Sequence, residues 1–327
     1  MNLKENVILS VKNLHVYLKN EEEKIPVVEE VDFQILKGKT LGIIGESGSG
    51  KSVTCSSVLG ILDGEKWEST GEVFFEGNAM PYHNRKFLNK ILGKKIAWIT
   101  QNPMSAFDPL FTIEYHFQET VKAHENKSRI DIRKNAAEIL KRLHIHDPER
   151  VLESYSFQLS GGMLQRVMIA IALIQKPSLL IADEPTTALD LTVQHDIIKL
   201  LKEMQEELQM AILLVSHDLG VVSKIADDIM VMYAGKNIEY SPAGTIIKNP
   251  VHPYTKGLFK SRPVFSKERL PVLKGQAAGI LNRGKGCMFY ERCPGAVKGC
   301  KEKEIPGVTV AKKHMVRCLE VIKNSEK

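Results

Sequence analysis

Short apolar runs alternate with amphipathic segments along most of the chain. Residues 179–182 and 211–215 are almost entirely apolar, which is typical of strands buried on both faces of a parallel sheet. Residues 129–143 and 193–208 instead carry apolar side chains three and four positions apart, the period of an amphipathic helix. Helices that alternate with buried strands predict a doubly wound α/β core.

The two ends of the chain follow different patterns. Residues 7–11 and 31–35 have the composition of strands, so we expect a β-rich N-terminal part. Beyond about residue 241 prolines follow one another closely and the apolar period fades. We therefore expect one domain over residues 1–241 and a C-terminal extension over residues 242–327.

Residues 45–52, with the sequence GESGSGKS, link an apolar strand-like run to a helical pattern. Glycines let such a turn fold into a nest whose N–H groups point at phosphates, and the start of a helix adds a favourable dipole. A lysine supplies charge and a serine hydroxyl suits Mg²⁺. An ordinary glycine-rich turn does not require Lys-Ser at this offset. We predict ATP or GTP binding by Gly45, Glu46, Ser47, Gly48, Ser49, Gly50, Lys51 and Ser52.

Polar residues follow both buried strands. Asp183 and Glu184 end the run 179–182, and His217 follows the run 211–215, so all three are expected at one sheet edge beside the phosphate loop. Asp183 suits Mg²⁺, Glu184 can polarise the water that attacks the γ-phosphate, and a neutral His217 can hydrogen-bond that phosphate. The alternative is a helix-capping acidic pair before Pro185.

Composition limits the class of protein. The chain has 327 residues, of which 43% are hydrophobic, 26% charged and 6% aromatic, as in a soluble globular protein. It lacks an apolar run long enough to span a membrane, and its first residues lack a signal-peptide core, so we expect it to stay in the cytoplasm. Its net charge of +6 is spread out and gives little support for nucleic-acid binding.

Residues 159–166, LSGGMLQR, precede another helical pattern and resemble the signature sequence of ABC-type ATPases. The resemblance covers roughly residues 7–260. It implies a P-loop ABC cassette with a helical subdomain at about residues 101–175 and binding of ATP with Mg²⁺. It also implies that two cassettes pack head to tail, so that Ser160, Gly161 and Gly162 of one close over the nucleotide of the other.

The same resemblance gives roles to further residues. Gln101 resembles the Q-loop glutamine, which touches Mg²⁺ and the attacking water and responds to the membrane partner. Asp190 lies in a segment similar to the D-loop, and His217 corresponds to the switch histidine. Tyr17 is the candidate for stacking on adenine, although Leu18 occupies the expected offset.

Residues 101–109, 161–166 and 249–255 resemble the nickel/peptide importer branch of the family. We favour nickel or a nickel–metallophore complex as the solute, with dipeptides or oligopeptides as the alternative. The implied partners are a paralogous ATPase subunit, two permease subunits and an extracytoplasmic solute-binding protein, which would place the chain at the cytoplasmic face of the membrane. A soluble ABC ATPase acting on ribosomes or DNA is a remote alternative, because no second cassette or coiled coil is visible. Glu184 and His217 disfavour a module that no longer hydrolyses ATP.

Cysteines gather in the C-terminal extension. In a cytosolic protein this favours a metal or iron–sulfur site over disulfides. The residues resemble the cysteine cluster that many peptide-importer ATPases carry, which implies a [4Fe–4S] group, with zinc or unligated core cysteines as alternatives. The candidate ligands are Cys287, Cys293, Cys300 and Cys318.

Overall fold

The computed structural model describes residues 6–20, 23–186, 191–260, 275 and 284–325. Contacts group the chain into two units. Unit 1 consists of residues 1–8, 35–39 and 80–214, and unit 2 of residues 9–34, 40–79 and 215–327. Among the described residues, no helix has both the length and the apolar character needed to cross a membrane.

The strands of unit 1 occur in the order β8-β7-β6. Strands β6 (Ile96–Ile99) and β7 (Leu179–Asp183) are parallel neighbours, and β8 (Ala211–Val215) lies on the other side of β7. Every residue of β7 and β8 is buried. This confirms the strands predicted from their unbroken apolar runs.

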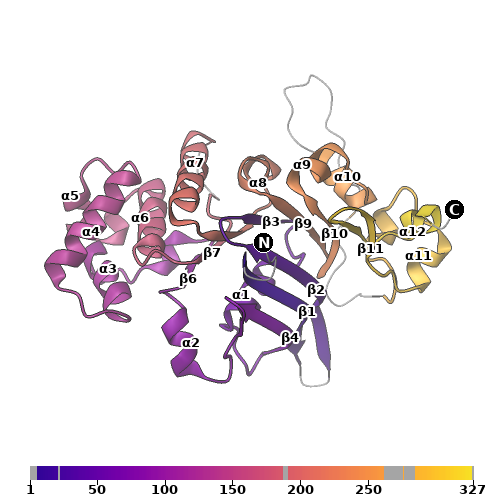
Figure 1. Ribbon diagram of the computed structural model, residues 1–327, viewed down its shortest axis with the longest axis horizontal. Coiled ribbons are helices and arrows are strands. Elements are labelled where there is room, and N and C mark those ends of the chain that lie inside the picture. The colour runs from indigo at the N-terminus through magenta and orange to yellow at the C-terminus, as the bar shows by residue number, and fades with distance from the viewer. Residues whose placement is uncertain (1–5, 21–22, 187–190, 261–274, 276–283, 326–327) are drawn as a thin grey trace. The chain divides into compact units, whose positions relative to one another are not determined.

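Unit 1 also contains helices, of which α3 to α6 lie together in Figure 1. Side-chain caps start several of them, with Ser128 accepting from the Asp131 N–H at α4 and Asp147 from the Arg150 N–H at α5. The helical elements are α2 (Arg85–Ile91), η2 (Pro103–Ala106), α3 (Ile113–Lys122), α4 (Arg129–Arg142), α5 (Pro148–Glu153), η3 (Ser156–Gln158), α6 (Gly161–Leu173) and α7 (Leu191–Leu208).

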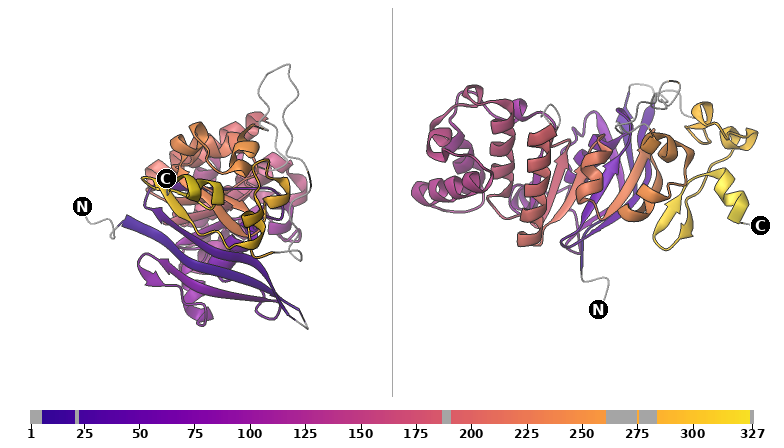
Figure 2. Two further views of the ribbon diagram at one scale, coloured as in Figure 1. Left: turned by 90° about the vertical axis from the view of Figure 1, so that its right-hand side faces the viewer. Right: turned by 90° about the horizontal axis from the view of Figure 1, so that it is seen from above.

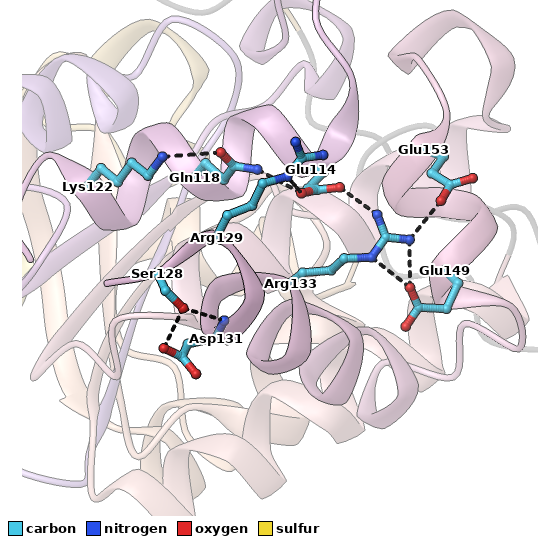
Figure 3. A network of polar contacts seen from close by, with 9 residues as sticks. All are labelled: Glu114, Gln118, Lys122, Ser128, Arg129, Asp131, Arg133, Glu149 and Glu153. Carbon is cyan, nitrogen blue, oxygen red and sulfur yellow. Dashed lines mark hydrogen bonds and ion pairs between the residues drawn. The ribbon is translucent and has the colours of Figure 1, made fainter. Parts of the chain in front are cut away.

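A buried carboxylate joins α3, α4 and α5 (Figure 3). The Glu114 side chain is only 4% exposed and accepts hydrogen bonds from Arg129 Nε and Arg133 Nη1, each at 2.6 Å. Arg133 also bonds to Glu149 and Glu153 on α5. Because these arginines stabilise the ionised carboxylate, they hold the pKa of Glu114 below its ordinary value of 4.5.

Unit 2 contains two groups of strands. The first has the order β2-β1-β4-β5, with β1 (Val7–Lys19), β2 (Lys24–Leu36), β4 (Trp67–Phe75) and β5 (Asn78–Ala79). The second has the order β11-β12-β10-β9-β3, with β3 (Thr40–Ile44), β9 (Asp228–Tyr233), β10 (Lys236–Pro242), β11 (Val308–Ala311) and β12 (His314–Val316). The helical elements are α1 (Lys51–Leu59), α8 (Leu219–Ile225), α9 (Ala243–Lys248), α10 (Pro253–Lys260), η5 (Tyr290–Arg292), α11 (Lys298–Glu302) and α12 (Leu319–Ser325).

Strands β10, β12 and β11 run side by side (Figure 2), so the C-terminal extension adds strands to the sheet of unit 2. Glu239 of β10 is fully buried and makes a 2.8 Å contact with His314 Nε2 of β12. The same carboxylate accepts the N–H groups of Val251 and His252. These bonds tie the extension to β10 at several points. The domain boundary at residue 241 stays a prediction.

Candidate nucleotide site

The glycine-rich turn between β3 and α1 has the conformation that its sequence predicts. Gly48 and Gly50 adopt φ angles of 77° and 99°, which disfavour any residue with a Cβ atom. At Gly45 an added Cβ would lie 2.3 Å from the carbonyl oxygen of Met232, so the turn packs directly on β9. The helix α1 begins at Lys51, and its N-terminus therefore adjoins the turn.

Lys51 is folded back on this turn. It is only 6% exposed, and its Nζ donates to the carbonyl oxygens of Gly45 and Glu46, both at 2.9 Å, and to Ser49 Oγ at 3.4 Å. Ser52 is exposed at the start of α1. The ammonium group thus lies against the oxygen atoms of the turn, and its positive charge beside the turn suits an anionic ligand.

Gln101 and Glu184 meet in unit 1. Gln101 follows β6 and Glu184 follows β7, and the C-terminal ends of parallel neighbouring strands lie at the same sheet edge. Gln101 Nε2 donates to Glu184 Oε2 at 2.8 Å. The structure therefore joins two residues that were predicted separately, one from a strand end and the other from a family motif.

The turn that carries Glu184 is held by the helix of the signature sequence. Glu184 adopts a φ angle of 48°, a left-handed conformation that is uncommon outside glycine. The buried Gln165 of α6 donates from Nε2 to the carbonyl oxygen of Pro185 at 2.5 Å. Sequence reasoning quoted Gln165 within the signature but gave it no role. Asp183, at the end of β7, is 5% exposed.

Ser160, Gly161 and Gly162 form the N-terminal turn of α6. Ser160 is the helix cap, and its Oγ accepts the Met163 N–H at 3.3 Å. An added Cβ at Gly161 would meet no atom within 4 Å. Ser160 and Gly162 line a cavity of about 530 Å³ in unit 1 with basic side chains that include Arg150 and Arg166. The signature turn is therefore open to solvent on one side.

The remaining predicted residues lie in unit 2, apart from Asp190, which lies outside the described residues. His217 is exposed and immediately precedes Asp218, which caps α8. Tyr17 lies on β1, half-buried, with its ring stacked on that of His15 at a centroid distance of 6.1 Å. Its role in binding adenine stays a prediction.

Two residues of the C-terminal extension contact the phosphate loop, and sequence reasoning missed both. The Arg292 guanidinium bonds to both carboxylate oxygens of Glu46, and the Tyr254 hydroxyl accepts the Glu46 N–H at 2.9 Å. The bond to Glu46 raises the pKa of Arg292, and burial raises the pKa of Tyr254. No periodicity or spacing indicates such contacts, because Arg292 lies 246 positions beyond Glu46.

All four cysteines of the extension line one small cavity, together with His252 and Glu320. Burial raises the pKa of Cys287 to about 11 and also raises that of Cys293. Within the part of the chain that the structure describes, no group of three or more His, Cys, Asp or Glu side chains is placed to hold a metal ion. This arrangement supports neither the predicted [4Fe–4S] group nor the zinc alternative.

Two family models match the chain. Residues 28–187 match the ABC transporter model, and residues 238–300 match the oligopeptide/dipeptide transporter C-terminal region. The first match includes the phosphate loop, the signature and the strand that ends in Asp183. The second includes three of the four cysteines in the extension.

Curated relatives match over nearly their whole length. The dipeptide transport ATP-binding protein DppD of Haemophilus influenzae is 40% identical, with 91% of each chain covered. The oligopeptide transport ATP-binding protein AppD of Bacillus subtilis is 39% identical, with 96% of each covered.

Among solved structures, the post-hydrolysis dimer of the ATP-binding cassette MJ0796 with ADP and Pi is 30% identical. It matches with a TM-score of 0.65 over 72% of this chain and 99% of its own. CbiO1 of Clostridium perfringens is 28% identical, with a TM-score of 0.63 over 75% of this chain and 92% of its own. These likenesses confirm the predicted ABC cassette fold with its β-rich and helical parts. The chain belongs to the ABC transporter family, as an ATP-hydrolysing subunit with the C-terminal region of oligopeptide and dipeptide transporters.

Proposed function

We propose that this protein hydrolyses ATP to drive the import of dipeptides or oligopeptides. The peptide assignment rests on the match of residues 238–300 to the C-terminal region of oligopeptide and dipeptide transporters. The two relatives described above are named as dipeptide and oligopeptide transport proteins. Our preference for nickel is not supported by these comparisons, and the peptide alternative fits them better. That preference rested on the likeness of residues 51–55, 60–62, 101–109 and 161–166 to nickel-import subunits.

The predicted phosphate, magnesium and catalytic residues each have a part in this proposal. Loop N–H groups and Lys51 bind the β- and γ-phosphates, and the position of the Lys51 ammonium against the turn supports this role. Oxygen atoms of Ser52, Gln101 and Asp183 are the type of donor that Mg²⁺ prefers, and the ion neutralises charge on the phosphates when bound. Glu184 polarises the attacking water, and its bond to Gln101 orients the carboxylate.

Two further residues complete the proposed site. His217 donates to the γ-phosphate, and Asp190 belongs to the contact between cassettes. We further propose that two cassettes, this one and a paralogue, pair head to tail so that each signature turn closes over the other's nucleotide. The open position of the turn at Gly161 supports this arrangement.

The proposed membrane partners are two permease subunits, served by an extracytoplasmic solute-binding protein, and the chain then lies at the cytoplasmic face of the membrane. Exposed apolar side chains close to Gln101 in the sequence support a protein partner. Phe111 and Tyr115 stack at a centroid distance of 4.1 Å yet remain 38% and 41% exposed. Leu110 beside them is 79% exposed. Such a patch suits a docking surface.

For the cysteines we propose an iron–sulfur cluster. What supports it is the gathering of four thiols around one cavity, because a cluster accepts ligands spread more widely than those of a single ion. Protein purified without oxygen should contain about four iron and four sulfide per chain if all four cysteines ligate. Elemental analysis of Cys293→Ser beside the unchanged chain checks this, with Cys55→Ser as the control because Cys55 is buried in α1. Four thiols that alkylate freely in the folded, metal-free protein would rule the cluster out.

Solute uptake by vesicles that contain the whole complex tests the proposed function. We expect ATP-dependent uptake of labelled dipeptides or oligopeptides and none of free nickel. Uptake of nickel with no transport of either peptide class would overturn the solute assignment and leave the ATPase assignment intact.

A further inference from the structure

The C-terminal extension makes a charged contact with the phosphate loop. Arg292 Nη1 lies 2.7 Å from Glu46 Oε2, and Arg292 Nη2 lies 2.9 Å from Glu46 Oε1, so the pair is bidentate. The Arg292 side chain is 6% exposed and that of Glu46 27% exposed. A bidentate pair fixes the relative orientation of the two side chains and also adds to their attraction. Burial reduces the screening of that attraction by salt.

Aromatic rings hold the arginine in this position. Its guanidinium carbon lies 5.8 Å from the centre of the Tyr233 ring and 5.7 Å from that of Phe289, within cation–π range. Arg292 Nη1 also donates to the Tyr233 hydroxyl at 3.3 Å. Tyr254 packs against both rings and accepts the Glu46 N–H through its hydroxyl. The loop residue is therefore held at its side chain and at its backbone by the same cluster.

Glu46 matters for the loop because its peptide group also contacts Lys51. The Glu46 carbonyl oxygen accepts from Lys51 Nζ at 2.9 Å, so a shift of Glu46 moves a partner of the phosphate-binding lysine. Glu46 also carries a negative charge within a loop that binds a polyanion. Without a cation beside it, that charge opposes phosphate binding.

We propose that Arg292 is a positioning residue for nucleotide binding. It neutralises Glu46 and fixes the outer side of the phosphate loop, so the C-terminal extension contributes directly to nucleotide affinity. The inference rests on the proposed assignment of residues 45–52 as the phosphate loop.

The test is equilibrium binding of MgADP and of a non-hydrolysable MgATP analogue to the purified full-length subunit. Arg292→Met keeps the apolar contact with the rings but removes the charge, and we expect it to raise Kd about tenfold, a coupling typical of contacting side chains. Arg292→Lys keeps the charge and should recover part of the affinity. In a Glu46→Gln background, Arg292→Met should change Kd less than about twofold, because no loop charge remains to be neutralised.

Arg317→Ala is the matched control. Arg317 also reaches from the extension to another part of unit 2, where it bonds to Glu30 Oε2 at 2.8 Å, but this contact does not involve the phosphate loop. The Arg317→Ala substitution should leave the Kd for nucleotide unchanged. Equal losses from Arg292→Met in both backgrounds, a matching loss in Arg317→Ala, or no loss at all would each overturn the inference. Lys51→Ala tests the phosphate-loop assignment separately from the role of Arg292. Unchanged nucleotide binding in Lys51→Ala would refute the loop assignment itself.

Discussion

At the scale of single residues, Glu184 and Gln101 illustrate how two strand ends create chemistry. They follow the parallel neighbours β6 and β7, and Gln101 Nε2 lies 2.8 Å from Glu184 Oε2. For the role that we propose for Glu184, this contact orients the carboxylate before substrate binds, which reduces the reorganisation that proton removal requires.

Replacing Glu184 with Gln should slow ATP hydrolysis by about two to four orders of magnitude, since a positioned base contributes that much. Nucleotide affinity should stay close to its original value, because the amide keeps the shape of the side chain. ATP turnover and binding are measured in a complex whose other cassette carries the equivalent substitution, so that an active partner cannot mask the effect. Lys51→Ala is the contrasting variant and should lose affinity instead. Undiminished turnover in Glu184→Gln would refute the role of this carboxylate.

The residues for which the sequence allows a prediction are those with a motif in their immediate neighbours along the chain. Lys51 and Glu184 each follow a strand within a recognisable motif, so short-range order was enough. Arg292 could not be found in this way, because its role depends on a contact that only the folded sheet of unit 2 brings about.

At the scale of elements, Glu114 shows that ion pairs join α3, α4 and α5 in addition to apolar packing. Glu114→Gln should lower the free energy of unfolding by about 2 kcal/mol, because it removes charge-assisted hydrogen bonds to two arginines. Urea unfolding at pH 7 measures the change. Glu119→Gln, an exposed position on the same helix, is the control and should change stability by less than about 0.5 kcal/mol.

The stabilisation that Glu114 provides should also depend on pH. The pKa of Glu114 is lower in the folded protein than its ordinary value of 4.5, so its contribution is present above pH 4.5 and is lost as the pH falls through the folded pKa. The stability difference between the original chain and Glu114→Gln should therefore shrink below pH 4.5. A difference that is constant from pH 7 to pH 3 would show that the arginines do not act on the ionised carboxylate.

Elements with strong periodicity were predicted with nearly correct bounds. The helix expected over residues 129–143 is α4 (Arg129–Arg142), and the strand expected over 211–215 is β8 (Ala211–Val215). Strands β11 and β12 were missed because each is short: β11 has four residues, none of them buried, and β12 has only three residues, too few to show a period. The pairing of β12 with β10, and of β11 with β12, is a tertiary effect that local sequence does not encode.

At the scale of the whole molecule, the sequence predicted the cassette because several motifs occur in the order of one family. It could not separate nickel from peptide as the solute, because the solute is expected to contact the permease and binding protein instead of this chain. It also could not show that the extension joins the sheet beside β10 and reaches the phosphate loop.

The signature turn allows the pairing of two cassettes to be tested separately from nucleotide binding. Gly161→Glu should fold normally, because an added Cβ meets no atom within 4 Å and a carboxylate at a helix N-terminus is favourable. It should bind ATP through its own loop with unchanged affinity. Its charge should repel the γ-phosphate held by the opposite cassette, so that ATP-dependent association and hydrolysis both fail.

Light scattering and ATP turnover with the partner subunit measure these effects, and Gly161→Ala, which adds no charge, is the control. Normal association of Gly161→Glu in ATP would refute the head-to-tail arrangement, whereas lost ATP binding by the isolated variant would place the signature turn at the chain's own nucleotide.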